Sequence, residues 1–200
     1  MDKYISFKRR AEKKTDYKQR LAFIKSGTAR MVIRRSIRNI RIQFINFAVN
    51  GDVVVTEELS KNLEKYGWNF HDANLPASYL IGYLAGAKAL SKGVKDAIVD
   101  IGLQDSVKSS SLYCAALGAK DAGININIGK EVLPSKERAS GRHISSYAAK
   151  IKGSPEYKKQ FSSYLKKGID PEKMHEMFEH VKKEIAAKHN ISLTTKEKGV

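Results

Sequence analysis

Residues 30–55 read RMVIRRSIRNIRIQFINFAVNGDVVV and predict three consecutive β-strands. The segments 30–36 and 40–49 are rich in β-branched and aromatic residues, and in the second one apolar and polar residues alternate. Asn50-Gly51 is the strongest short signal for a β-hairpin, and three valines follow it almost at once. We therefore expect the three strands to pair antiparallel.

Helices and short strands are expected on the C-terminal side of this stretch. The patterns predict helices over 57–66, 75–90, 109–122, 137–151 and 155–166, a further helix after residue 170, and strands over 96–102 and 124–128. Gly82 and Gly86 lie on a small-residue face that we expect to pack closely against the sheet, with a dimer contact as the weaker alternative. The predicted fold class is α/β: a mixed sheet of about three antiparallel strands, then helix-strand-helix-strand, with a basic N-terminal extension and C-terminal helices.

Charge is segregated along the 200 residues. The chain has 37 Lys+Arg against 21 Asp+Glu, a net charge of +16, which favours a polyanionic partner, nucleic acid first and an acidic membrane second. Residues 1–47 hold 14 basic and 3 acidic residues (net +11), residues 48–134 hold 8 and 10 (net −2), and residues 135–200 hold 15 and 8 (net +7). The basic excess is therefore concentrated ahead of an ordinary globular core.

These composition changes divide the chain into four segments. We expect a basic RNA-binding extension with a short helix over 1–27, an α/β core domain over 28–134, a C-terminal helical segment over 135–190 and a flexible tail over 191–200.

The extension has two parts. Residues 4–14, YISFKRRAEKK, have too few apolar side chains to bury themselves, which favours a free basic arm that orders on phosphates over a merely solubilising tail. Thr15 is the expected cap of a helix over 15–25, and Tyr17 and Leu21 belong to an apolar stripe by which this helix would dock.

Cations also line the first predicted strand. Arg30 and Arg34 share one face, whereas Arg35 lies on the other. The favoured interpretation is phosphate contact from a rigid platform, because no acid within 30–49 pairs with these arginines locally. Protection of an edge strand by charge is the alternative.

Several classes of chemistry are disfavoured. A single cysteine, Cys114, excludes an internal disulfide, and its apolar surroundings indicate an inert thiol. His175 and His180 are five residues apart and so do not share a helix face as a zinc-protease motif requires. Asp96 and Asp100 share a strand face where a magnesium ion is conceivable, but local pairing is the better interpretation.

No apolar run approaches ~18 residues and the start lacks a signal-peptide pattern, so we expect a cytoplasmic protein without a transmembrane helix.

Taken in chain order, a set of motifs resembles the archaeal and eukaryotic family of large-subunit ribosomal protein eighteen, the 5S-rRNA binder, whose eukaryotic relative is called ribosomal protein L five. The motifs are Phe7-Lys8-Arg9-Arg10, Lys14-Thr15-Asp16-Tyr17, Arg30-Met31-Val32-Ile33-Arg34, Gly67-Trp68, Pro76-Ala77, Leu84-Ala85-Gly86, Asp100-Ile101-Gly102-Leu103, Asp121-Ala122-Gly123 and Gly168-Ile169-Asp170-Pro171. The resemblance runs from about residue 3 to 189 and is closest to the archaeal form.

The resemblance implies a structural protein of the large subunit rather than an enzyme, without cofactor, metal, membrane or small-molecule substrate. Its partners would be 5S rRNA, 23S rRNA and neighbouring proteins of the central protuberance, including the ribosomal protein called five in prokaryotes. An RNA-processing enzyme and an anionic-membrane binder are the rival classes. Neither has support, because 48–134 shows no catalytic cluster or phosphate loop, and the 15–25 helix has only a narrow apolar stripe without Trp.

The same resemblance assigns candidate RNA-binding residues. Those matching the family are Lys8, Arg9, Arg10, Lys14, Thr15, Tyr17, Arg20, Arg30, Arg34 and Ser36. Neighbouring charge adds Lys13, Lys18, Arg35, Arg38, Arg142 and His143, although a structural role for His143 is an equal alternative. Lys13 and Ser109 stand where the family usually has Gly, and Arg142 stands where an acidic or neutral residue is common.

Overall fold

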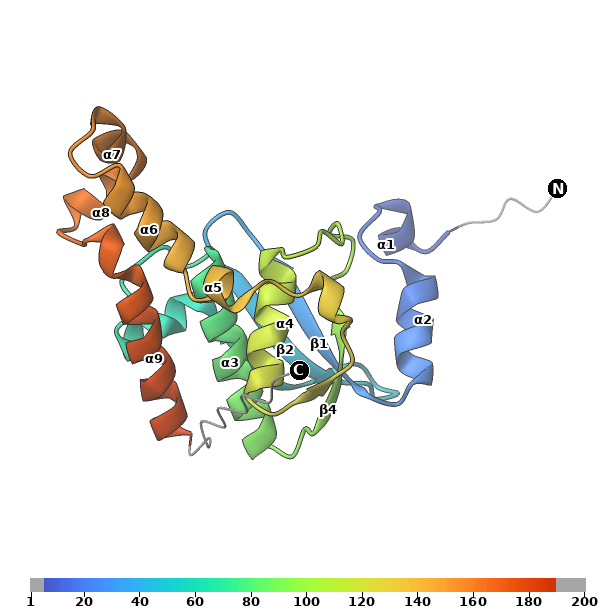
Figure 1. The fold of residues 1–200 in the computed structure, drawn as a ribbon. Helices are drawn as coiled ribbons and strands as arrows, with labels where there is room; N and C mark the ends of the chain where they lie inside the picture. Colours follow the sequence, from blue (N-terminus) through green and yellow to red (C-terminus); the bar gives the residue numbers. More distant parts are fainter. Residues whose placement is uncertain (1–5, 190–200) are drawn as a thin grey trace.

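The strands β1 (Ala29–Arg35), β2 (Ile40–Asn46) and β3 (Val53–Leu59) form the antiparallel arrangement predicted from 30–55. The computed structural model describes residues 6–189 (Figure 1), so Tyr4 and the predicted tail over 191–200 lie outside the described residues. β4 (Asp96–Asp100) runs parallel to β1, and β5 (Asn125–Ile126) runs parallel to β4. The strand order β3-β2-β1-β4-β5 is that of a mixed α/β sheet, which confirms the predicted fold class.

Helices cover one face of this sheet. Met31, Ile33, Ile42 and Phe44 are fully buried on that face, beneath the helix layer of α3 (Leu75–Ser91) and α4 (Ser111–Asp121) (Figure 1). Their alternation with polar residues explains the burial, since successive side chains of a strand point to opposite faces. The opposite face, here called the open face, therefore carries the residues between them, including Arg30 and Arg34.

The two glycines of α3 lie against the helix α4, where the sheet was expected. A Cβ placed on Gly82 would overlap the carbonyl oxygen of Ala115 in α4, and one on Gly86 would lie 3.0 Å from Ala119 Cα. Both glycines are buried, as are most residues of α3. The close approach of two helix backbones explains the small-residue face without any dimer contact.

Three predicted helices begin or end elsewhere. The helix expected over 57–66 starts only after β3, as the 3-10 helix η1 (Ser60–Tyr66), because Glu58 still belongs to the strand and is buried beside Lys88 Nζ at 2.5 Å. The helix expected over 137–151 is broken at Gly141, whose φ of 77° separates α5 (Lys136–Ala139) from α6 (Arg142–Lys150). The one expected over 155–166 is divided into α7 (Pro155–Gln160) and α8 (Ser162–Lys166).

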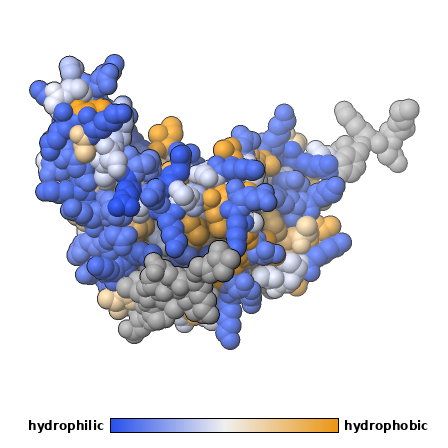
Figure 2. Space-filling model, viewed as in Figure 1, coloured by the Kyte–Doolittle hydropathy of each residue, from blue (hydrophilic) through white to orange (hydrophobic). Residues whose placement is uncertain are grey.

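The C-terminal helices share the main core. α9 (Met174–Lys188) follows the short 3-10 turn η3 (Pro171–Lys173) and lies beside α3 (Figure 1). Phe178, Val181 and Ile185 are buried at the helical spacing seen in the sequence. Hydrophilic side chains dominate the visible surface over α6–α9 (Figure 2). Within residues 6–189, no helix has the length and hydrophobicity needed to cross a bilayer.

Candidate nucleic-acid interface

The first part of the extension contains a helical turn where the sequence predicted a free arm. α1 (Lys8–Ala11) is a single turn that buries no residue, and Lys13 follows it with a φ of 51°. This left-handed conformation is the one that glycine adopts most easily. Lys13 therefore keeps the backbone path expected of the glycine it replaces while adding a cation.

Asp16, not Thr15, caps the second helix of the extension, α2 (Tyr17–Lys25). Asp16 Oδ1 accepts hydrogen bonds from the backbone nitrogens of Lys18 and Gln19 at 2.9 and 3.1 Å. Thr15 Oγ1 instead accepts one from Arg9 Nε at 2.9 Å. Thr15 thus joins α1 to the start of α2.

The apolar stripe of α2 does not dock the helix, contrary to expectation. α2 buries none of its residues, and Leu21 is 53% exposed. An ion pair attaches the helix instead: Arg20 Nη2 lies 3.0 Å from Asp52 Oδ2, in the loop between β2 and β3. Most of the surface of α2 is consequently available to a partner.

This ion pair is the first link of an arginine–aspartate chain, which consists of Arg20, Asp52, Arg30, Asp100 and Arg34. Arg30 Nη2 lies 2.6 Å from Asp52 Oδ2, and its Nη1 lies 3.6 Å from Asp100 Oδ2. Arg34 Nη2 donates to Asp100 Oδ1 at 3.1 Å, and Arg34 Nη1 donates to the Asp100 carbonyl at 2.8 Å. The chain connects α2, the β2–β3 loop, β1 and β4 across the open face.

Asp52 and Asp100 are the acids that pair with the arginines of β1. Asp52 and Asp100 lie outside the window 30–49, so neither pairing could be inferred from the residues next to these arginines. β1 is also the central strand of the sheet, so protection of an edge strand does not explain its arginines. Asp100 accepts hydrogen bonds from Arg34 Nη2 at 3.1 Å and from the backbone nitrogen of Gly102 at 2.8 Å, and Asp96 accepts one from Asn125 at 2.7 Å, so both carboxylates have partners within the protein.

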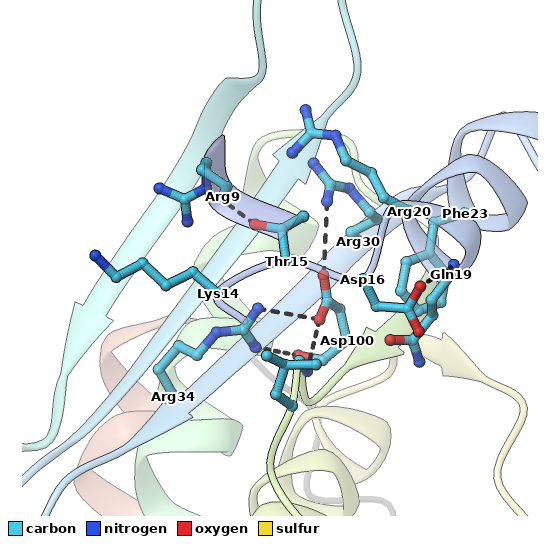
Figure 3. A pocket seen from close by; sticks show the side chains of 12 residues that line it. Arg9, Lys14, Thr15, Asp16, Gln19, Arg20, Phe23, Arg30, Arg34 and Asp100 are labelled. Carbon is cyan, nitrogen blue, oxygen red and sulfur yellow. Dashed lines mark hydrogen bonds and ion pairs between the residues drawn. The ribbon is translucent and has the colours of Figure 1, made fainter. Parts of the chain in front are cut away.

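A pocket of about 170 Å³ lies between the extension and the open face (Figure 3). Its cationic lining comes from three elements and the α1–α2 connection: Arg9, Lys14, Arg20, Arg30 and Arg34. Asp16 and Asp100 also line it, but both carboxylates already accept hydrogen bonds from the protein. The structure thus gathers six of the predicted site residues, Thr15 included, around one cavity.

The remaining predicted residues of the extension and β1 lie outside that cavity. Lys8, Arg10, Lys13, Lys18, Arg35 and Arg38 are exposed. Tyr17 packs on Phe7 with ring centroids 5.1 Å apart. Ser36 closes the β1–β2 turn, since its Oγ donates to the Asn39 carbonyl at 2.9 Å and accepts from Asn39 N at 3.0 Å. Ser36 therefore shapes the turn that presents Arg35 and Arg38.

Arg142 and His143 lie apart from the other predicted site residues. They begin α6, on the opposite side of the molecule from α1 and α2 (Figure 1). The Arg142 guanidinium lies 3.8 Å from Glu137, with both side chains largely exposed. Partial burial and the nearby Arg138 lower the pKa of His143, which disfavours its charged form.

The fold and this interface define a class: a basic structural protein whose α/β core carries a cationic extension suited to a polyanion. The chain belongs to the family of ribosomal large subunit proteins 60S L5 and 50S L18, whose family model matches residues 3–98. This confirms the resemblance seen in the motifs. A member of this family is a structural, non-enzymatic component of the large subunit of the cytoplasmic ribosome, among rRNA and other ribosomal proteins.

Relatives match over almost the whole chain. It is 47% identical over 186 residues to the large ribosomal subunit protein uL18 of Korarchaeum cryptofilum, which covers 93% of this chain and 95% of the relative. It is 42% identical over 182 residues to the protein of the same name from Methanococcus maripaludis, a match that covers 90% of this chain and 94% of the relative. It is 46% identical over 183 residues to the protein of the same name from Thermofilum pendens, a match that covers 90% of this chain and 93% of the relative.

Proposed function

We propose that this protein binds 5S rRNA through its extension and the open face of β1, and that it helps attach 5S rRNA to 23S rRNA in the central protuberance. The observation that carries the proposal is the gathering of cations from α1, α2 and β1 around one pocket. A-form RNA hides its base edges in a narrow major groove, so contacts to phosphates and 2′-hydroxyls would dominate recognition.

The proposed RNA-binding residues fall into two groups. The contact group consists of Lys8, Arg9, Arg10, Lys13, Lys14, Thr15, Tyr17, Lys18, Arg20, Arg34, Arg35 and Arg38, with Arg142 and His143 as a separate contact on α6. Two further residues lie beneath this surface: Arg30, which is only 5% exposed and faces RNA only through the pocket that it lines, and Ser36, which closes a turn. Phe7 is 65% exposed and supplies an aromatic surface beside the cations for an unpaired base.

We also propose that the four segments inferred from composition are functional units: extension, core, C-terminal helices and tail. They are not proposed as independently folding domains, because α9 and the sheet bury side chains in the same core. The C-terminal helices would face the neighbouring ribosomal proteins or 23S rRNA.

The test is a titration of 5S rRNA at several salt concentrations. Replacing Lys8, Lys13 and Lys18 by Gln removes three exposed cations of the extension without touching the pocket lining. Each lost phosphate contact should shallow the log Kd against log salt slope by ~0.7–0.9, hence by about 2 in total. Deleting residues 1–14 should shallow it by several units.

The matched control replaces Lys61, Lys65 and Lys95, three exposed lysines remote in sequence from the extension, by Gln. It changes the net charge by the same amount and should leave the slope nearly unaltered. Equal slopes for the two triple variants, or an unchanged slope after the deletion, would contradict the proposal.

A further inference from the structure

We propose that the pocket between the extension and the open face is a site for one phosphate group, and that in the assembled particle this group is a backbone phosphate of the bound rRNA. The inference rests on the proposed function for the source of the phosphate. It goes further than the proposed function because it assigns one phosphate group to a defined pocket, in addition to the general electrostatic attraction of RNA by the surrounding cations.

The first observation is an unused buried donor. Arg30 is 5% exposed and lines the pocket, yet its Nε has no hydrogen-bond partner among the described residues. Its other two nitrogens are directed to Asp52 and Asp100. A buried donor without an acceptor is costly, and an anionic oxygen is the acceptor that relieves this cost most.

The second observation is an imbalance of charge. The arginine–aspartate chain contains three guanidinium groups and two carboxylates, and one carboxylate oxygen, Asp52 Oδ2, is shared by Arg20 and Arg30. Arg9 and Lys14 add two further cations to the lining, while Asp16 also lines the pocket and Glu12 lies 2.9 Å from Lys14 Nζ, so five cations stand against four carboxylates. Attraction between charges is stronger in a partly enclosed pocket than in bulk water, so a bound anion would balance the excess.

The third observation is the kind of donor present. Figure 3 shows Arg34 and Arg30 converging on Asp100, with Thr15 between Arg9 and Arg30, and Lys14 near Arg34. Arg34 Nη1 already donates to the Ile33 and Asp100 carbonyls, and Arg34 Nη2 donates one hydrogen to Asp100 Oδ1. The remaining N–H groups of Arg34 and the terminal nitrogens of Arg9 are the guanidinium donors left for the oxygens of a phosphate. Thr15 Oγ1 accepts from Arg9, which leaves its own hydroxyl hydrogen free to donate. A group with several acceptor oxygens satisfies these donors better than a carboxylate.

The first arm of the test uses the free full-length protein and inorganic phosphate. Thermal unfolding is followed as phosphate replaces chloride at constant ionic strength. A saturable rise in Tm is expected, because a ligand that binds only the native state stabilises it. Arg34→Lys keeps the positive charge but removes the planar guanidinium group with its several N–H donors. Thr15→Val removes the hydroxyl group without changing the charge. Both should abolish most of the rise.

The matched control is Arg41→Lys. Arg41 lies opposite Arg34 in the pairing of β1 with β2, is exposed, does not line the pocket and is not among the proposed RNA contacts. It should retain the full response to phosphate. A linear, unsaturable response that is the same in all variants would overturn the phosphate site.

The second arm measures binding of 5S rRNA to the same variants. Loss of a charge-assisted hydrogen bond to one phosphate should weaken binding by about 10- to 100-fold in Arg34→Lys, and by less than about 3-fold in Arg41→Lys. Normal rRNA affinity in Arg34→Lys together with a lost phosphate response would overturn the assignment to rRNA and leave a site for free phosphate.

The two proposals fail separately. If the wild-type protein does not bind 5S rRNA, the proposed function fails, while the phosphate response still tests the pocket. If the wild-type protein binds 5S rRNA but Arg34→Lys and Arg41→Lys behave alike in both arms, the pocket fails and the extension remains the binding element. Circular dichroism of each variant checks that the fold is intact.

Discussion

Arg30 and Asp52 are 22 residues apart in the chain, and their side chains meet at 2.6 Å, Nη2 to Oδ2, on the open face of the sheet. The same Asp52 oxygen accepts from Arg20 of α2 at 3.0 Å. One carboxylate in the β2–β3 loop therefore neutralises a buried strand arginine and anchors the extension. Because α2 buries no side chain of its own, this anchor is a principal attachment of the helix to the core.

Asp52→Asn should destabilise the protein by about 3 kcal/mol, because it leaves the buried Arg30 guanidinium without its closest carboxylate. The control is Glu57→Gln, which breaks the exposed pair with Arg41 (3.3 Å) and should cost less than about 1 kcal/mol. Urea unfolding of both variants gives the comparison. Equal losses of stability would show that Asp52 is no more than a surface partner.

Ser109→Gly should stabilise the protein by about 0.5–1 kcal/mol. Ser109 has a φ of 56°, a conformation that is strained for a residue with a Cβ, and part of the relief is offset by the greater freedom of glycine in the unfolded chain. Its backbone N–H bond to the Val132 carbonyl, 2.9 Å, is unaffected. Ser110→Gly, at a φ of −74°, is the control and should be destabilising or neutral. The urea midpoint decides, and a loss of stability in Ser109→Gly would contradict the prediction.

Gly82→Ala should cost about 3 kcal/mol or more, because the added methyl overlaps the Ala115 carbonyl and forces α3 away from α4. Gly129→Ala is the matched control: a Cβ there meets nothing within 4 Å, its φ is −59°, and the change should lie within about 0.5 kcal/mol. Thermal unfolding of the two variants tests this. Similar Tm values for both would mean that the two helices separate at little cost.

The pH dependence of stability should carry a contribution from Cys114. Burial raises the pKa of its thiol to about 12, so the native state keeps the proton while the unfolded thiol begins to ionise near pH 9. The contribution is therefore complete below pH 9 and declines as the pH rises towards 12, by about 1.4 kcal/mol per pH unit. Cys114→Ala should flatten the curve of unfolding free energy against pH in this interval. Parallel curves for wild type and variant would exclude the effect.

Sequence reasoning was most successful where the pattern was local. The alternation over 40–49 and the Asn50-Gly51 signal predicted β2 and its hairpin to β3, and the spacing of Phe178, Val181 and Ile185 predicted the buried stripe of α9. It was less successful at helix ends. Asp16 rather than Thr15 caps α2, although both residue types are good caps, and Thr15 accepts a hydrogen bond from Arg9.

The sequence predicted which residues belong to the candidate site, but not how they contact one another. The cations of the extension and of β1 were identified as a group from charge and resemblance. Their contacts were not, because Asp52 comes from a loop and Asp100 from a strand that follows an intervening helix. Only the strand order, which places β4 against β1, brings Asp100 to Arg30 and Arg34.

The sequence by itself determined which segments are strands or helices, where the positive charge is concentrated and which family the motifs resemble. These properties depend on periodicity, turn residues and composition, which act over a few neighbouring positions. The tertiary structure alone decided that Arg30 is a buried link rather than an exposed contact, that α2 is attached by an ion pair rather than by its apolar stripe, and that six predicted residues enclose one pocket. Those outcomes depend on approaches between residues distant in the chain, which are fixed only when the sheet and the helices pack together.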